Sequence, residues 1–201
     1  ATITVNCPIS VDAGSDITVS EMQSIELDAT VSCSPNTGTI DTEDIGSGNY
    51  TLSQTTITTT PGGFWSNVSG YKSWYGESNY TGTGNNYTAG PSAPNTGDDY
   101  IYVETSSGYA YSSGDIAYLR SNPISQGGVI ISFYYHMCGS DIGTLSLESY
   151  DGSSWTERWS LSGQQQISQT DAWIQANVDL SSYTVTQLRF KYVADGGYKG
   201  D

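Results

Sequence analysis

The sequence predicts an all-β fold, a jelly-roll-like antiparallel β-sandwich that follows a short N-terminal β segment. The 201-residue chain is rich in Ser, Thr, Tyr and Gly, a composition that suits strands and tight turns and disfavours helices. Apolar and polar residues alternate with a period of two, and turn residues separate these runs at short intervals. This pattern is typical of sandwiches and has no helical period.

The strand pattern is clearest in the C-terminal half of the chain. The predicted strands there are residues 100–104, 116–119, 128–137, 144–150, 155–159, 173–178 and 188–193. Residues 128–137 have apolar side chains at both odd and even positions, so both faces of the strand are apolar. This indicates a central strand of the sandwich. Asp151-Gly152 lies between two of the strands and predicts a hairpin turn.

The N-terminal part has a different texture. Residues 17–19 and 25–31 are strand candidates, whereas residues 46–97 combine Gly, Asn, Thr, Ser and Tyr in strands broken by long loops. Residues 55–60 form either an exposed strand or an extended linker. We therefore divide the chain into an N-terminal β segment or linker, residues 1–45, and a jelly-roll domain, residues 46–201.

Charge excludes several classes of partner. The chain carries 21 Asp and Glu against 6 Lys and Arg, for a net charge of −15. Binding to a nucleic-acid backbone needs clustered basic residues, and an acidic chain is repelled by anionic lipid surfaces. No apolar run approaches the roughly 18 residues that a membrane-spanning helix needs. We expect an extracellular protein with no nucleic-acid partner and no membrane insertion.

The three cysteines leave two interpretations open. Cys7 and Cys33 lie in the N-terminal segment, and Cys138 follows a predicted core strand. A Cys7–Cys33 disulfide with Cys138 as a small buried apolar residue suits an extracellular protein. Alternatively, all three are free thiols. One histidine and no C-x-x-C motif make a Cys/His zinc site a poor fit.

A set of motifs in order resembles the MAM domain family over about residues 62–201. Tyr100 begins a Tyr-rich strand, Asn122-Pro123 ends another, and Gly200-Asp201 resembles the family's G-D before its last strand. The strongest likeness is the run Phe133 to Met137, with Gly139 and then Gly143-Thr144-Leu145, which is similar to the family's F-x-Y-H-M-x-G…G-T-L signature. The sequence looks most like the bacterial versions in large secreted proteins of gliding and marine bacteria.

The N-terminal segment resembles the opening strands of a PKD-type immunoglobulin-like domain, through residues 12–14, 18–19 and 25–30. The family pattern has a further acidic strand after the position of Asp201, and an opening F-E strand for which Glu43-Asp44 is the nearest match. A sheet without its last strand exposes backbone donors and acceptors at an edge. We therefore expect that further residues or another chain complete the sheet.

The resemblance implies a calcium ion, because MAM domains and other jelly rolls sometimes hold one. Calcium takes six to eight oxygen ligands. The candidate ligands are carboxylates at loops and strand ends, namely Asp98, Asp99, Glu104, Glu43 and Asp201. The alternative interpretation is a solvated loop pair at Asp98-Asp99 and a frayed terminus at Asp201.

Aromatic residues are the other candidate for binding. Trp65, Tyr71, Trp74, Tyr75, Tyr80 and Tyr87 crowd one loop-rich stretch. Trp74 and Tyr75 would stack on sugars or anchor a protein if they were exposed, and would be core residues if they were buried. His136 is the single histidine, and its place in a predicted central strand favours a packed side chain over a catalytic one.

These observations give one main functional prediction and one alternative. The main prediction is a non-enzymatic adhesion or recognition module on a large secreted or cell-surface protein, which the family likeness extends to an adhesin exported by the type IX route. It would contact a protein partner or a surface glycan. The alternative is a carbohydrate-binding module attached to a secreted hydrolase or peptidase. The sequence contains no nucleophile elbow, P-loop or dinucleotide fingerprint.

Overall fold

A computed structural model describes the fold. The described residues are 2–5, 10–12, 30–32, 39–42, 55–56, 63–78, 89–97, 99–105, 111–125 and 128–200. They contain strands and no helix, and therefore no helix long and apolar enough to cross a membrane. The predicted strand at residues 17–19 and most of that at residues 25–31 lie outside the described residues.

Two antiparallel sheets form the body of the molecule, and strands named next to each other below are hydrogen-bonded neighbours. The five-stranded sheet runs β12 (Trp155–Ser162), β11 (Thr144–Tyr150), β14 (Gln187–Val193), β9 (Ile116–Ser121) and β6 (Trp65–Asn67). The four-stranded sheet runs β13 (Ile174–Leu180), β10 (Val129–Tyr135), β1 (Thr2–Val5) and β4 (Thr39–Thr42). The predicted antiparallel β-sandwich is confirmed, with β10 as a central strand.

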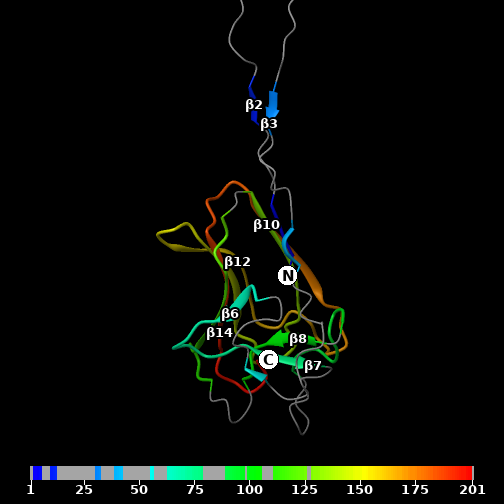
Figure 1. Ribbon diagram of the computed structural model, residues 1–201. Helices are drawn as coiled ribbons and strands as arrows, with labels where there is room; N and C mark the ends of the chain where they lie inside the picture. Colours follow the sequence, from blue (N-terminus) through cyan, green and yellow to red (C-terminus); the bar gives the residue numbers. More distant parts are fainter. Residues whose placement is uncertain are drawn as a thin grey trace, which may run out of the picture.

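Two smaller antiparallel sheets complete the described strands. One is β5 (Thr55–Thr56), β7 (Tyr75–Ser78) and β8 (Asp99–Tyr102), and the other is the pair β2 (Ser10–Asp12) and β3 (Thr30–Ser32). Figure 1 shows β6, β12 and β14 on one side of the molecule, and β7, β8 and β10 on the other. Within the described residues, β8 pairs with β7 and belongs to a different hydrogen-bonded sheet from β10.

Alternation along the strands builds the core between the layers. In β14, Leu188 and Phe190 are buried, whereas Arg189 and Lys191 point to the outer face. The Phe190 ring packs edge-on against Phe133 of β10, with 4.9 Å between the ring centroids. Each fully buried apolar side chain of this size contributes about 1.5–3 kcal/mol. The two layers are held together by this apolar contact.

The hairpin predicted at Asp151-Gly152 joins β11 to β12. Gly152 has a φ of +104°, a region that strongly favours glycine. The Asp151 carboxylate accepts hydrogen bonds from the backbone N–H groups of Ser153 and Ser154, at 2.7 and 2.8 Å. This local ring of donors fixes the turn and so sets the register of the two strands.

Strands from the N-terminal segment take part in the sandwich. β1 lies between β10 and β4, with Thr2 opposite Ser132 and Val5 opposite Val129. Residues within 1–45 thus contribute strands to the same sheet as β10. The boundary at residue 45 and the PKD-like assignment stay predictions.

Candidate recognition site

The predicted calcium ligands lie only partly within the described residues. Asp99, the first residue of β8, is 4% exposed, and Glu104, just after β8, is 1% exposed. The Glu104 carboxylate accepts a hydrogen bond from the Tyr102 hydroxyl at 3.3 Å. Asp98, Glu43 and Asp201 lie outside the described residues, as do Cys7 and Cys33. Cys138 is buried, at 2% exposure.

One observation at Asp99 fits a cation. Its Oδ2 is buried and has no hydrogen-bond partner among the described residues. A buried carboxylate oxygen without a partner is costly, and a bound cation is one way to satisfy it. Within the described part of the chain, however, no three His, Cys, Asp or Glu side chains gather closely enough to hold a metal ion. Calcium therefore stays a prediction.

Trp74 and Tyr75, the predicted ligand-binding pair, differ from each other in how deeply they are buried. Trp74 is 7% exposed and belongs to the core, while Tyr75 is half-buried at the start of β7. The Asn67 side chain fixes this corner, because its amide accepts from the Trp74 N–H at 2.9 Å and donates to the Trp74 carbonyl at 3.0 Å. The Trp74 ring N–H has no hydrogen-bond partner among the described residues. The ligand role of both residues stays a prediction.

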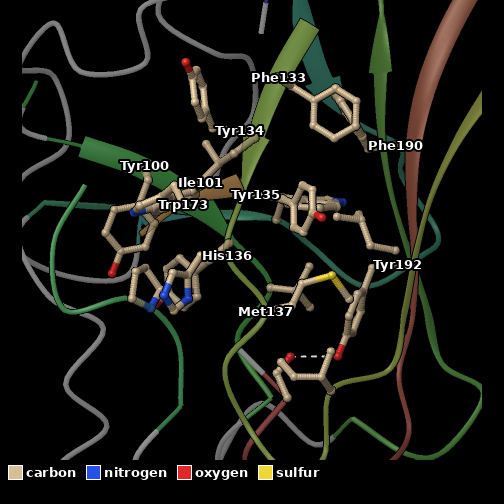
Figure 2. Close-up of a pocket in the computed structure, with 17 residues that line it drawn as sticks. Tyr100, Ile101, Phe133, Tyr134, Tyr135, His136, Met137, Trp173, Phe190 and Tyr192 are labelled. Atoms are coloured by element: carbon tan, nitrogen blue, oxygen red, sulfur yellow. Dashed lines mark hydrogen bonds between the residues drawn. The ribbon is translucent and has the colours of Figure 1, made fainter. Parts of the chain in front are cut away.

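A cavity of about 140 Å³ lies beside β8 and β10 (Figure 2). Its walls are mainly apolar and aromatic. They are formed by Trp74, Pro91, Tyr100, Ile101, Tyr102, Val103, Phe133, Tyr134, Tyr135, His136, Met137, Ile142, Leu145, Trp173, Phe190, Tyr192 and Gly200. Apolar cavities with a few polar groups are the usual form of a binding site. This cavity is our candidate recognition site, and the sequence motifs did not reveal it.

Alternation in β10 divides the side chains around the cavity. Figure 2 shows Phe133, Tyr135 and Met137 on one side of the strand, and Tyr134 and His136 on the other. The Tyr134 side chain is 49% exposed, whereas Phe133 and Met137 are buried. The C-terminal end of β10 therefore presents an apolar face to the core and an aromatic face to the outside.

His136 is packed rather than poised for catalysis. Its ring lies 5.6 Å from the Trp173 ring, centroid to centroid. Burial lowers the pKa of His136, whereas the nearby backbone and charge of Asp171 act in the opposite direction. Neither ring nitrogen has a hydrogen-bond partner among the described residues. The imidazole is therefore neutral at pH 7.

The C-terminal segment closes one wall of the cavity. The Tyr192 hydroxyl donates to the Gly200 carbonyl at 2.7 Å and accepts from the Gly143 N–H at 2.9 Å. The Gly200 N–H donates to the Thr105 hydroxyl at 3.0 Å, which ties this segment to the residues after β8. Gly143 has no room for a side chain, because a Cβ there would lie 1.9 Å from the Val193 carbonyl oxygen.

The outer face of the five-stranded sheet carries a charged cluster that sequence reasoning missed. Glu148 of β11 accepts from Arg189 of β14, and Lys191 lies 3.5 Å away. The Arg189 guanidinium also lies 4.1 Å from the ring centroids of both Tyr118 and Trp155. Cation–π contacts of this kind hold an arginine rigidly. The register of β11 and β14 pairs Glu148 with Arg189, but the sequence alone does not show which strands are neighbours.

The family model for the MAM domain, described as meprin/A5/mu, matches residues 37–201. The chain belongs to the MAM domain family. The match includes the motif at the C-terminal end of β10, which lines the cavity, and starts earlier than the likeness that the motifs indicated. The MAM assignment confirms the predicted family.

Curated relatives carry the same domain. The chain is 36% identical over 108 residues to a human protein named MAM domain-containing glycosylphosphatidylinositol anchor protein 1. It is 35% identical over 108 residues to the rat and mouse proteins of that name. Each alignment covers 51% of this chain and 11% of the relative, so the matched MAM region spans about a tenth of those proteins.

Solved structures with a related arrangement come from cleaved adhesin domains of Lys-gingipain. The K2 domain is 15% identical, with a TM-score of 0.47, and the match covers 69% of this chain and 84% of that one. The K1 domain, from Porphyromonas gingivalis W83, is also 15% identical, with a TM-score of 0.43, covering 64% and 80% of the two chains.

Proposed function

We propose that this chain is a non-catalytic, extracellular adhesion and recognition module of a larger secreted or cell-surface protein. The observation that carries the proposal is the MAM family match over residues 37–201. The curated relatives are named as glycosylphosphatidylinositol-anchored proteins, and the matched region is 11% of the human protein's length. A small part of a long surface protein is the expected setting for a recognition module.

The polar side chains of the described residues support a binding role over a catalytic one. His136 packs against Trp173 with no carboxylate or hydroxyl bonded to its ring. Glu148 is held by Arg189, and Glu157 accepts from the hydroxyls of Ser146 and Ser160. Carboxylates engaged in this way stabilise the sheet, and they are not presented in pairs across a cleft as glycoside hydrolysis needs.

A protein partner suits the site better than a surface glycan. Sugar platforms need exposed aromatic rings, and Trp74 is 7% exposed. The cavity beside β8 and β10 is lined instead by apolar core side chains and the edge of a strand. These features favour contact with a polypeptide. The Tyr134 ring, which lines the cavity and is 49% exposed, is the feature that suits the carbohydrate-binding alternative.

Two finer parts of the proposal rest on the family likeness. The parent protein is a large bacterial surface adhesin exported by the type IX route, as the resemblance to bacterial MAM domains implies. A calcium ion stiffens the module near the start of β8, which the unpartnered Oδ2 of Asp99 supports. When bound, calcium would gather carboxylate and carbonyl oxygens and so stabilise the loop before the strand.

Adhesion of coated beads tests the proposal. Beads carrying the folded chain are placed on arrays of extracellular proteins and of glycans, beside beads carrying the Gly143→Ala chain as an unfolded control. We expect the folded chain to retain beads on protein spots, and the control to lose this retention. Retention on glycan spots alone would instead support the carbohydrate-binding alternative.

A further inference from the structure

On one side, strand β10 is paired with a neighbouring strand along only part of its length. Its pairing with β1 ends where Thr2 lies opposite Ser132. On its other side, β13 continues as far as Ile174, opposite Tyr135. Among the described residues, no strand lies next to Phe133, Tyr134 and Tyr135 on the side away from β13. Within the described part of the chain, the sheet therefore has an open position beside the C-terminal end of β10.

Backbone hydrogen bonds show which groups face this open position. The side-chain amide of Gln166 donates to the Tyr135 carbonyl at 3.3 Å and accepts from the Met137 N–H at 2.7 Å. The same amide also donates to the carbonyl of Ala172, just before β13. The backbone N–H and C=O groups of the odd-numbered residues Tyr135 and Met137 thus face Gln166 and β13. Because the N–H and C=O of alternate residues in an antiparallel strand point to opposite sides, those of Tyr134 and His136 face the open position.

The cavity lies beside the same open position. Phe133, Tyr135 and Met137 of the β10 segment form one wall, and residues 100–103, in and just after β8, form another. β8 is paired with β7. An extended segment placed along β10 would send every second side chain into the cavity.

Charge identifies the kind of segment that fits. The chain has 21 acidic and 6 basic residues, for a net charge of −15. A segment with apolar residues at alternate positions and Lys or Arg between them complements both the apolar cavity and the net negative charge of the chain. An acidic segment would be repelled.

We propose that the open position beside Tyr134 and His136 accepts an extended, basic segment of a second protein as an added β-strand. This inference rests on the proposed recognition function and gives it a mechanism. Strand addition gives affinity through main-chain hydrogen bonds, and the cavity gives specificity for the inward side chains. The partner segment is recognised by apolar side chains at alternate positions and by the positive charge of the residues between them.

A synthetic nine-residue peptide in which Val alternates with Lys and Thr provides the probe. Amide hydrogen exchange of the 201-residue chain is followed with and without the peptide. We expect exchange at Tyr134 and His136 to slow at least tenfold at saturating peptide, with little change at the paired residues Ile130 and Ile131. A peptide with Glu in place of Lys is expected to bind at least tenfold more weakly.

Two controls separate strand addition from general stickiness. Peptides N-methylated at either set of alternate residues lose the donors of one edge, so at least one should bind tenfold more weakly. Filling the cavity with Leu145→Trp should reduce binding, whereas Ile167→Trp, at a side chain 90% exposed, should not. The methylated peptides keep the test valid if Leu145→Trp unfolds the chain.

Several results would overturn the proposal. Equal binding of all methylated peptides would show that main-chain bonding is not involved, and absence of binding by the alternating peptide would remove the strand site. Protection of Tyr134 before any peptide is added would show that the position is filled already, by a second copy if sedimentation gives a dimer or by the chain itself if it gives a monomer. Bead adhesion without peptide binding would reject strand addition and leave the adhesive function standing.

Discussion

Arg189 and Glu148 form an ion pair across the neighbouring strands β14 and β11, on the outer face of the five-stranded sheet. Their side chains are 18% and 9% exposed, so both charges are largely removed from water. The rings of Tyr118 and Trp155 cover the guanidinium at 4.1 Å. This arrangement joins three strands and the hairpin end of β12 into one unit.

Removing the arginine should therefore destabilise the fold. Arg189→Met leaves a buried carboxylate with only Lys191 nearby, and breaking a buried pair from one side costs about 3–5 kcal/mol. We expect a loss of about 2–4 kcal/mol, because Lys191 keeps part of the charge compensation. Urea unfolding measures it, with Lys191→Met as the matched control at about 0–1 kcal/mol. Equal losses of unfolding free energy for the two substitutions would show that Arg189 compensates the Glu148 charge no more than Lys191 does.

Two glycines with different surroundings give a second prediction. A Cβ at Gly143 would lie 1.9 Å from the Val193 carbonyl oxygen, so Gly143→Ala must displace backbone. Gly163 has a φ of +71° and open space around it, so Gly163→Ala meets only conformational strain, about 1–2 kcal/mol. We expect Gly143→Ala to be unfolded at 25 °C and Gly163→Ala to fold. Circular dichroism distinguishes them, and a folded Gly143→Ala chain would show that this contact is tolerated.

His136 predicts a loss of stability in mild acid. Its pKa in the folded chain is lowered, chiefly by burial, from a usual value of 6.5. Between that value and the lower folded pKa, the unfolded chain binds more protons, so stability falls as the pH drops below about 6.5. We expect the melting temperature to fall between pH 7.5 and pH 5.

The matched variant for this effect is His136→Gln, which cannot titrate. Its melting temperature should change less over the same interval. Asp115, Asp151 and Asp179 also have lowered pKa values, but as carboxylates they weaken the fold only at more acidic pH, as they become protonated. An equally large fall in the glutamine variant would assign the acid sensitivity to other groups.

Calcium binding is tested by thermal unfolding with excess calcium and then with chelator. A ligand that binds only the folded chain stabilises it by about 2.7 kcal/mol at one hundred times its Kd. We expect a rise in melting temperature with calcium that Asp99→Asn abolishes. In chelator, Asp99→Asn should be at least as stable as the unchanged chain, because it removes a negative charge from a buried position where one oxygen has no partner among the described residues. No calcium shift would remove the ion from the proposal.

The sequence predicted the sandwich well where alternation was strong. Residues 144–150 were placed as a strand and form β11, and Asp151-Gly152 forms the hairpin. The short strands β6 and β7 lie in the stretch described as loop-rich, because three or four residues carry too little alternation to be recognised. That β10 is central followed from its apolar residues on both faces.

The candidate site was harder to predict than the fold. The aromatic pair Trp74 and Tyr75 was visible in the sequence, but whether such rings are exposed depends on neighbours that are distant in the chain. The Asn67 clamp on Trp74 and the partial pairing of β10 arise only in three dimensions. The motif at the C-terminal end of β10 marked the right strand, but its open side and the cavity beside it had no sequence signal.

The central claim is that the folded chain acts by adhering to protein. Bead retention on a native extracellular surface, measured after treatment of that surface with protease or with glycosidase, tests it most directly. We expect beads carrying the folded chain to be retained, and we expect protease treatment of the surface, but not glycosidase treatment, to abolish retention. Retention that survives protease but not glycosidase would contradict it, as would equal retention of beads carrying a Gly143→Ala chain that circular dichroism shows to be unfolded.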